Sequence, residues 1–311
     1  MARRARRDRD ARPGPSGFLV VDKPPGWTSH DVVDAARRWL GTRRVGHLGT
    51  LDPAATGVLP LAVRDATKLV PFLEAGRKGY AGTIRLGAET DTLDAEGEVL
   101  RRYEGALPDE AQVRAALPGF FGDIEQVPPM YSAVKRDGVP LHRLARAGKQ
   151  VERKPKSVCI DRLELLKYTP PDLEILVECS AGTYVRVLAE DLGRELGCGA
   201  HLAGLRRTRS GPFLEEHAVS EPVLRRASDE GEIDAMVSPA VNALEYPVVR
   251  LTPEEVGQVR HGSQVLAPET PLTPGTRVAA LDPSGVLLAV LEVRPGRRMH
   301  PLRVLSVAPP G

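Results

Sequence analysis

The stretch GHLGTLDPAATG at residues 46–57 interrupts a sequence that is otherwise periodic. It holds three glycines and one proline and follows neither helical nor strand spacing. Asp52 lies near its centre, and Pro53 restricts Asp52 to extended backbone. The flanking glycines let a ligand or another chain segment approach closely. Such a loop can present a carboxylate to a substrate, and it can equally well use Asp52 to start a turn.

Regular elements are predicted on both sides of this loop. Residues 17–22 (GFLVVD) are typical of a buried strand, and Thr28 or Ser29 is placed to cap a helix that ends at Gly41. We expect further strands at 58–63, 80–86, 158–166 and 173–179, and helices at 109–117 and from Tyr184 to Gly197. A short strand at 201–205 is expected to run into a turn, RRTRSG.

After about residue 245 the predicted elements are mostly short strands. A short helix at 253–260 and strands at 277–281, 286–293 and 302–307 predict a small β-rich module. The expected organisation is a disordered basic tail at 1–15, a catalytic domain at 16–245 and the β-rich domain at 246–311. Residues 128–156 lack a strong apolar face, so they predict a long excursion within the catalytic domain.

The composition excludes several classes of protein. No apolar run reaches the ~18 residues that a membrane-spanning helix needs. The three cysteines, Cys159, Cys179 and Cys198, form no CxxC pair, which argues against a disulfide framework and a zinc site and favours a reducing, cytoplasmic location. No motif for a dinucleotide, a nucleotide phosphate or a catalytic metal is present, so we expect neither cofactor nor metal.

The formal net charge of +2 hides local clusters. The basic tail holds six arginines against two aspartates, and acidic residues gather at 89–98. A second basic block occupies the excursion: Lys135, Arg136, Arg143, Arg146, Lys149, Arg153, Lys154 and Lys156. Arg206, Arg207 and Arg209 form a third cluster. Basic and acidic faces side by side favour phosphate binding, although charge runs are also common on plain solvated surfaces.

Two tyrosines lie in glycine-bounded motifs. Tyr80 stands between glycines in KGYAG (78–82), which would leave its ring open to stack on a base, and Tyr184 stands in GTYVR (182–186). Arg186 in the second motif could pair with Asp52, lower the pKa of that carboxyl and keep it ionised. Packing against the core is the alternative role for either ring.

Together these motifs resemble the TruB family of tRNA pseudouridine-55 synthases. The similarity extends from about residue 17 to 215 and includes VVDKPPGWTSHDVV (20–33), LGAETDTLDAEG (86–97), VPPMYSAVK (127–135) and CGAHLAGLRRTRSGPF (198–213). It implies an α+β fold in which a mixed, mostly antiparallel central sheet is flanked by helices. The C-terminal module resembles the PUA RNA-binding domain, and the excursion resembles the family's thumb.

The resemblance assigns a role to each matching position. Asp52 corresponds to the catalytic aspartate, Tyr80 to a tyrosine that stacks on the flipped uracil and is a candidate proton acceptor, and Arg186 to the arginine paired with the carboxylate. The implied substrate-binding positions are His47, Tyr184, Leu205 and Lys23. Candidate RNA contacts are Lys135, Arg143, Arg146, Arg206 and Arg207.

The implied reaction turns uridine 55 of the tRNA T loop into pseudouridine by flipping the base, cleaving N1–C1′ and rejoining through C5. Asp52 could attack the sugar, attack the base or deprotonate C2′, and the sequence does not choose among these. The implied partner is the tRNA T stem-loop, with no membrane, no obligate protein partner and a monomeric state, and help with tRNA folding is a further expectation.

Other functions remain open at this point. A glycoside hydrolase or nucleosidase would use Asp52 with a second carboxylate, for which Asp94 and Glu190 are conceivable. A non-catalytic RNA-binding protein or chaperone would use Asp52 only to shape a turn. A uridine C5-methyltransferase is disfavoured, because no cysteine lies in a glycine-rich loop.

Overall fold

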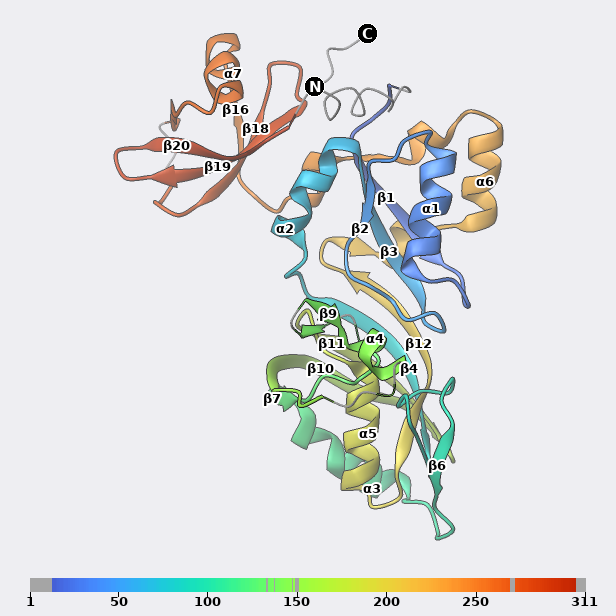
Figure 1. Cartoon of the computed structure of the whole chain (residues 1–311). Coiled ribbons are helices and arrows are strands. Elements are labelled where there is room, and N and C mark those ends of the chain that lie inside the picture. Colours follow the sequence, from blue (N-terminus) through green and yellow to red (C-terminus); the bar gives the residue numbers. More distant parts are fainter. Residues whose placement is uncertain are drawn as a thin grey trace.

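The computed structural model describes residues 13–132, 134–136, 138–146, 148, 151–268 and 272–305. The predicted disorder of the tail at 1–15 therefore falls almost entirely outside the described residues. A long twisted sheet runs through most of the molecule, as Figure 1 shows. Across this sheet lie β14 (Val219–Ser220), β1 (Gly17–Lys23), β3 (Thr56–Val63), β12 (Ala200–Ser210), β4 (Lys78–Leu86), β11 (Asp172–Cys179), β10 (Lys156–Thr169) and β7 (Gly122–Gln126).

Most neighbouring strands of this sheet are antiparallel. The parallel pairs are β1 with β14 and β12 with β3. Three short strands pair with members of the sheet: β2 (Val45–His47) with β3, β13 (Phe213–Leu214) with β12, and β15 (Ser238–Pro239) with β1. A mixed, mostly antiparallel sheet flanked by helices confirms the expected α+β fold.

The continuous apolar run at 17–22 has a structural cause, because β1 is buried on both faces. Leu19 and Val21 point into a core formed with the neighbouring helices, whereas Phe18 and Val20 point into a second core on the other face. Successive side chains of a strand point to opposite faces, so a strand between two cores needs apolar residues at almost every position.

Helices cover the first core. These are α1 (Ser29–Trp39), α3 (Glu110–Ala116), α5 (Val185–Glu195) and α6 (Glu221–Asp229), with the single turn α2 (Val70–Leu73) elsewhere. Thr28, one of the two residues expected to cap this helix, caps α1 through a reciprocal bond with Asp31. The 3₁₀ turns are η1 (Arg64–Leu69), η2 (Leu117–Phe120), η3 (Glu215–His217), η4 (Ile233–Met236) and η5 (Ala240–Ala243).

One expected turn is wrong. The segment RRTRSG was expected to end a short strand, yet β12 continues through it from Ala200 to Ser210. Bonds to β4 along its whole length, with two register shifts, hold the strand extended. Its arginines are tolerated in the sheet because Arg206 reaches carboxylates and Arg207 reaches backbone carbonyls.

The C-terminal residues form a separate five-stranded sheet. It contains β16 (Val248–Arg250), β18 (Arg277–Leu281), β19 (Leu287–Arg294), β20 (Arg298–Val304) and β17 (Val265–Leu266), in that order. Helix α7 (Pro253–Arg260) packs beside β17 and β20. The expected β-rich domain is confirmed, although β20 begins four residues earlier than predicted and ends at Val304.

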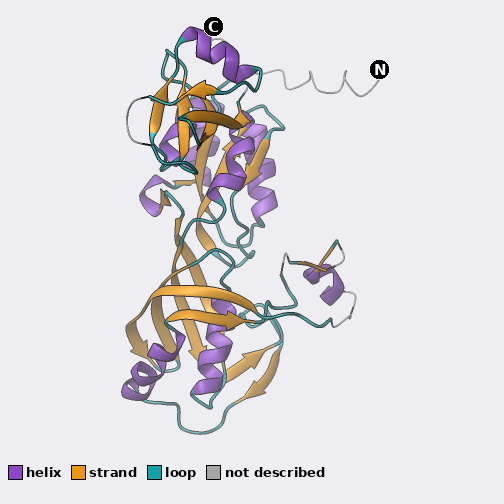
Figure 2. Ribbon diagram, turned by 90° about the vertical axis from the view of Figure 1, so that its left-hand side faces the viewer, coloured by secondary structure: helices purple, strands orange, loops and turns teal. Residues whose placement is uncertain are grey.

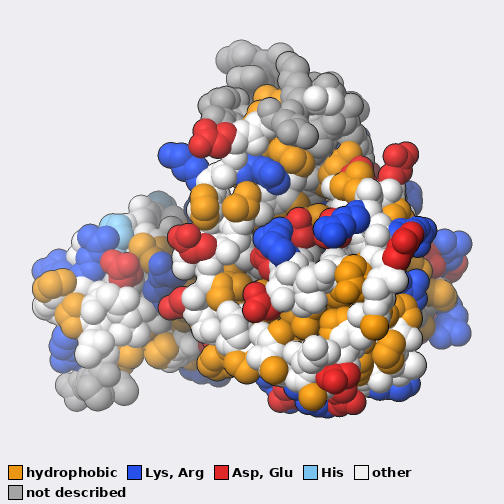
Figure 3. All heavy atoms as spheres, turned by 90° about the horizontal axis from the view of Figure 1, so that it is seen from below, with side chains coloured by type: hydrophobic (Ala, Val, Ile, Leu, Met, Phe, Trp, Pro, Cys, Tyr) orange, Lys and Arg blue, Asp and Glu red, His pale blue; other side chains and the backbone are white. Residues whose placement is uncertain are grey.

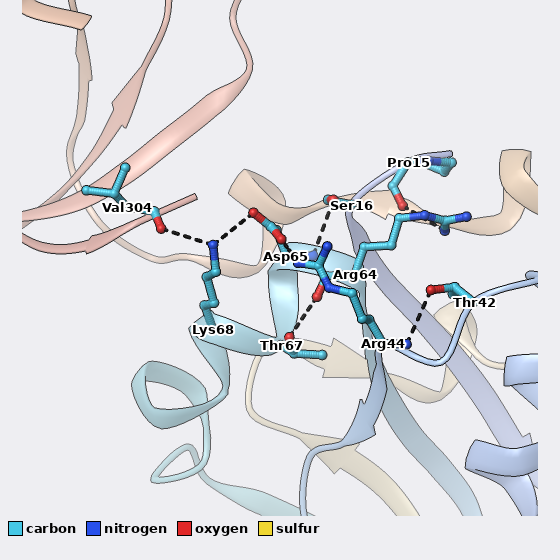
Figure 4. Close-up of polar contacts among 9 residues, drawn as sticks. All are labelled: Pro15, Ser16, Thr42, Arg44, Arg64, Asp65, Thr67, Lys68 and Val304. Carbon is cyan, nitrogen blue, oxygen red and sulfur yellow. Dashed lines mark hydrogen bonds and ion pairs between the residues drawn. The ribbon is translucent and has the colours of Figure 1, made fainter. Parts of the chain in front are cut away.

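The two sheets share the second apolar core. Phe18, Val58 and Ala62 of the large sheet pack in one cluster with Leu281 and Val290 of the small one. Polar contacts reinforce the junction, as Figure 4 shows. Lys68 on η1 pairs with the buried Asp65 at 3.0 Å and donates to the carbonyl of Val304 at 3.4 Å.

The expected excursion stands away from the body of the molecule in Figure 2. Its described parts are the two-stranded pair of β8 (Lys135–Arg136) with β9 (Val139–Pro140) and helix α4 (Leu141–Arg146). A further two-stranded pair, β5 (Ala88–Thr90) with β6 (Val99–Arg102), encloses the acidic segment.

Because the two sheets share this core, we expect that truncating a large side chain of β13 within it strongly lowers the free energy of unfolding. Phe213 is 6% exposed and its ring lies 5.1 Å from that of Phe18, whereas the adjacent Leu214 is 37% exposed. Phe213→Ala should lower the free energy of unfolding by about 3–5 kcal/mol. Leu214→Ala, the matched control, should lower it by roughly 1 kcal/mol or less. Urea denaturation measures both values, and equal losses would contradict a buried junction at Phe213.

Candidate active site

The loop between β2 and β3 carries Asp52, and buried side chains hold its backbone in place. Ser29, the first residue of α1, receives a bond from the Leu51 N–H at 2.9 Å and donates to the Leu51 carbonyl at 3.1 Å. The Pro53 carbonyl accepts bonds from the Gly26 N–H and from Lys23 Nζ, both at 2.9 Å. Both neighbours of Asp52 in the chain are thus anchored by hydrogen bonds.

Arg207 completes this support from behind the loop. Its buried guanidinium donates to the carbonyls of Val58, Gly49 and Thr50 at 2.7, 3.1 and 3.4 Å. Glycine is required where β12 passes closest to β3, since a Cβ at Gly57, whose φ is +96°, would lie 2.3 Å from the Arg207 carbonyl oxygen.

Asp52 and Arg186 form the ion pair that the sequence predicts. Arg186 Nη2 lies 2.7 Å from Asp52 Oδ2, and its Nη1 lies 3.4 Å from Asp94 Oδ2. The arginine side chain is 6% exposed, whereas Asp52 is 42% exposed and faces the open side of the site. Asp94 is in turn fixed by Thr92 Oγ1, which donates to Asp94 Oδ1 at 2.5 Å.

The pKa of Asp52 is shifted in the direction opposite to the expectation. Burial of the site raises the pKa of the Asp52 carboxyl above its usual value, Arg186 opposes that shift, and the charge on Asp94 adds to it. Arg186 thus lowers the pKa as predicted, but the cost of removing a carboxylate from water outweighs the ion pair.

A pocket of about 300 Å³ opens beside Asp52. Tyr80, Tyr184, Arg186 and Leu205, all predicted to be near the reaction centre, contribute to its wall. Tyr80 is 9% exposed, and burial raises the pKa of its phenol, so the hydroxyl stays protonated at neutral pH. The structure therefore brings five of the seven predicted catalytic and substrate-binding side chains to one cavity.

The other two, Lys23 and His47, are placed differently. Lys23 is fully buried and donates to three carbonyls, those of Pro24, Trp27 and Pro53. Its bond to Pro53 helps to hold the loop that carries Asp52. Burial also lowers the pKa of Lys23 to about 8. His47 ends β2 and does not line the pocket, and burial together with the charge of Arg207 lowers the pKa of its imidazole.

The residues expected to contact RNA differ in their exposure and in their bonding partners. Arg207 is 1% exposed and serves the loop, so the structure does not place it at an RNA-facing surface. Arg206 makes a two-pronged bond to Asp22, with both distances 3.0 Å, and an ion pair with Glu215. Arg143 is exposed on α4, whereas the side chains of Lys135 and Arg146 lie outside the described residues. Figure 3 shows basic and acidic side chains intermixed on the face seen from below.

Sequence reasoning missed three residues of this site. Gln126 at the end of β7 accepts a bond from the Tyr184 N–H at 2.9 Å and donates to its carbonyl, which fixes the start of α5. Asp94 was considered only as a partner in glycoside hydrolysis, and Lys78 was not considered. Strand alternation could have found Lys78, because it precedes Tyr80 by two positions in KGYAG and so shares its face.

The alternative carboxylate partner Glu190 pairs with Arg194 on α5 and does not line the pocket. Within the described ranges, no group of three or more His, Cys, Asp and Glu side chains is arranged to hold a metal ion. No helix among the described residues has the length and apolarity to span a membrane. The three cysteines are free thiols.

Three family models together match residues 37–306 of the chain. The family model described as TruB family pseudouridylate synthase (N-terminal domain) matches residues 37–185. The models for the tRNA pseudouridylate synthase B C-terminal domain and for tRNA pseudouridine synthase II, C-terminal, match 186–245 and 246–306.

Relatives with curated names are similar over nearly the full length. A protein of Pseudomonas paraeruginosa named tRNA pseudouridine synthase B is 46% identical over 93% of this chain and 96% of its own length. One of Burkholderia mallei with the same name is 46% identical over 93% of this chain and 94% of its own.

Solved structures give the same result. The crystal structure of a Cbf5–Nop10–Gar1 complex matches 94% of this chain and 84% of that chain with a TM-score of 0.70 and 29% identity. An H/ACA ribonucleoprotein structure, bound to a substrate RNA containing 2′-deoxyuridine, matches 94% of this chain and 85% of that one, with a TM-score of 0.72 and 26% identity. This chain therefore belongs to the TruB family of pseudouridylate synthases and is a pseudouridine synthase.

Proposed function

We propose that this enzyme converts uridine 55 in the T loop of tRNA to pseudouridine, with Asp52 as the catalytic carboxylate. The ion pair between Asp52 and Arg186 at the mouth of a pocket carries this proposal. The relatives named tRNA pseudouridine synthase B, at 46% identity, support tRNA as the substrate. The reducing cytoplasm suits both such a substrate and three free thiols.

The reaction is an isomerisation, so its bonds and protons balance within one nucleotide. The N1–C1′ bond breaks, the uracil turns, a C5–C1′ bond forms, C5 loses a proton and N1 gains one. Arg186 occupies Oδ2 of Asp52, which leaves Oδ1 to face the substrate. Asp52 can then attack C1′, attack the base or deprotonate C2′, and each of these routes requires the ionised carboxylate.

The pocket walls suit a single flipped base. Extracting a base from its stack costs a few kcal/mol, and stacking on an aromatic ring returns about 1–3 kcal/mol. Tyr80 provides such a ring, while Tyr184 and Leu205 contribute to the wall around the base. To accept the C5 proton, the role that the family resemblance implies, the Tyr80 phenol must first lose its own proton, and burial of the ring opposes that loss. His47, close to the pocket but outside its wall, is proposed to contact the neighbouring loop nucleotides.

Binding of the stem is proposed to involve the excursion and the C-terminal domain. Lys135, Arg143 and Arg146 stand on the excursion, which would close over the RNA as a thumb. Residues 246–311 would act as a PUA-like RNA-binding domain, joined to the catalytic domain at 16–245. We expect a monomer, and a grip of this kind can also assist tRNA folding independently of catalysis.

The direct test is to incubate the purified full-length protein with an unmodified tRNA transcript, without cofactor, and to map pseudouridine. We expect pseudouridine at position 55. A product at other uridines only, or on free uridine, would contradict the proposed substrate.

Asp52→Asn should abolish product formation, because the amide cannot act as a nucleophile or a base. The affinity for a T stem-loop should change by less than about tenfold, since Asp52 contributes chemistry rather than binding. Pseudouridine mapping and equilibrium binding measure the two quantities. Full activity of the pure variant would contradict the role of Asp52 in the reaction.

The raised pKa of Asp52 predicts an unusual pH profile. Activity needs the ionised carboxylate, so kcat/KM should fall as the pH drops through a pKa above that of an ordinary aspartate. Asp94→Asn removes a negative charge that raises this pKa, so the acid limb should move to lower pH. The exposed Asp229→Asn is the control and should leave the limb in place. A limb that stays fixed or moves upward in Asp94→Asn would contradict this account.

Substitutions at Tyr80 separate the ring from the hydroxyl. Tyr80→Phe keeps the stacking surface, whereas Tyr80→Leu loses it and with it about 1–3 kcal/mol of binding to the flipped base. We expect single-turnover rates to fall in the order wild type, Phe, Leu. Equal rates for all three would remove Tyr80 from the mechanism.

A further inference from the structure

Lys78 is a buried lysine in the wall of the pocket. It starts β4, two positions before Tyr80, so both side chains leave the same face of the strand. It is 6% exposed, and its Nζ would lie 4.0 Å from a Cβ placed on Gly49, in the loop that carries Asp52. The ammonium group therefore stands at the same end of the pocket as that loop.

The other buried cations near Asp52 each have two or three acceptors. Arg186 binds two carboxylates, Arg207 binds three carbonyls, and Lys23 binds three carbonyls. Lys78 differs, because among the described residues its Nζ has a single hydrogen-bond partner, the neutral hydroxyl of Ser210 at 3.0 Å. An ammonium has three donors, and a buried charge without a counter-ion is costly.

Within the described residues, Lys78 makes no ion pair with a carboxylate. On β12 it faces Ser210 and the positive Arg207, and on β11 it faces Cys179, whose thiol has a pKa raised to about 11 by burial. Glu74, after α2, lines the same pocket and its charge raises the pKa of Lys78, but it is exposed and makes no ion pair with Lys78 within the part of the chain that the structure describes. A buried ammonium with no ion-pair partner in a pocket is suited to receive an anion there.

We propose that Lys78 binds a phosphodiester oxygen of the flipped nucleotide. This inference rests on the proposed function, in which an RNA nucleotide enters the pocket. A flipped base brings its own backbone phosphate to the pocket mouth, and that phosphate is the anion available to an ammonium beside the base. Lys78 would determine how deeply the nucleotide enters the pocket, so that its glycosidic bond lies opposite Asp52.

The test compares Lys78→Met with Lys167→Met. Lys167 lies exposed on β10 and is paired with Glu174, so its variant loses one positive charge away from the pocket. Lys78→Met should raise KM for a T stem-loop by about tenfold or more with a smaller effect on kcat. The slope of log affinity against log salt should fall by about 0.7–0.9, the contribution of one phosphate contact. Lys167→Met should match the wild type in both quantities.

Lys78→Arg guards against misfolding, because it keeps the charge and should retain the wild-type salt slope. Burial lowers the pKa of Lys78 to about 8, so wild-type affinity should weaken above that pH more than the affinity of Lys78→Arg. A salt slope and KM for Lys78→Met equal to those of Lys167→Met would overturn the proposal. A loss confined to kcat would also overturn it, since Lys78 would then act on the base. If the wild type does not modify the stem-loop, the proposed function fails first.

Discussion

The ion pair between Arg186 and Asp52 is the contact on which the candidate active site depends. It joins the start of α5 to the loop between β2 and β3, two segments that only the central sheet brings together. A buried guanidinium needs compensation, which Asp52 and Asp94 supply to Arg186 from two sides. Asp94 and Gln126 serve this contact indirectly, because the first holds the far side of Arg186 and the second holds the helix that carries it.

Cations usually found on surfaces act here as internal scaffolding. Lys23 and Arg207 donate to carbonyls of the irregular loop between β2 and β3, Lys23 to that of Pro53 and Arg207 to those of Gly49 and Thr50. Backbone polar groups that are buried must be paired, and a long basic side chain can reach several carbonyls at once. The loop is thus rigid despite its glycines, and the position of Asp52 is set before any substrate arrives.

The elements predicted from periodicity were largely confirmed, because burial on one or two faces leaves a clear pattern in 17–22, 58–63 and 173–179. The β12 segment was predicted wrongly since its arginines are neutralised by residues far away in the sequence. The family resemblance implied a substrate-binding role for Lys23 and an RNA contact for Arg207, and the hydrogen bonds of both residues to the loop that carries Asp52 became visible only in the structure. Motifs identify which residues belong to a site. The hydrogen-bond and ion-pair partners of those residues depend on three-dimensional proximity, which a single sequence does not contain.

The apolar cluster that unites the two sheets has a consequence for how this protein can be divided. A chain cut after residue 245 would leave Phe18, Val58 and Ala62 facing water, although all three lie in strands of the catalytic domain. Such a fragment would report on folding and aggregation instead of on RNA contacts. The C-terminal module is therefore part of the structure that buries β1 and β3. A substitution on either side of the cluster must still pack against the other side if these strands are to remain buried.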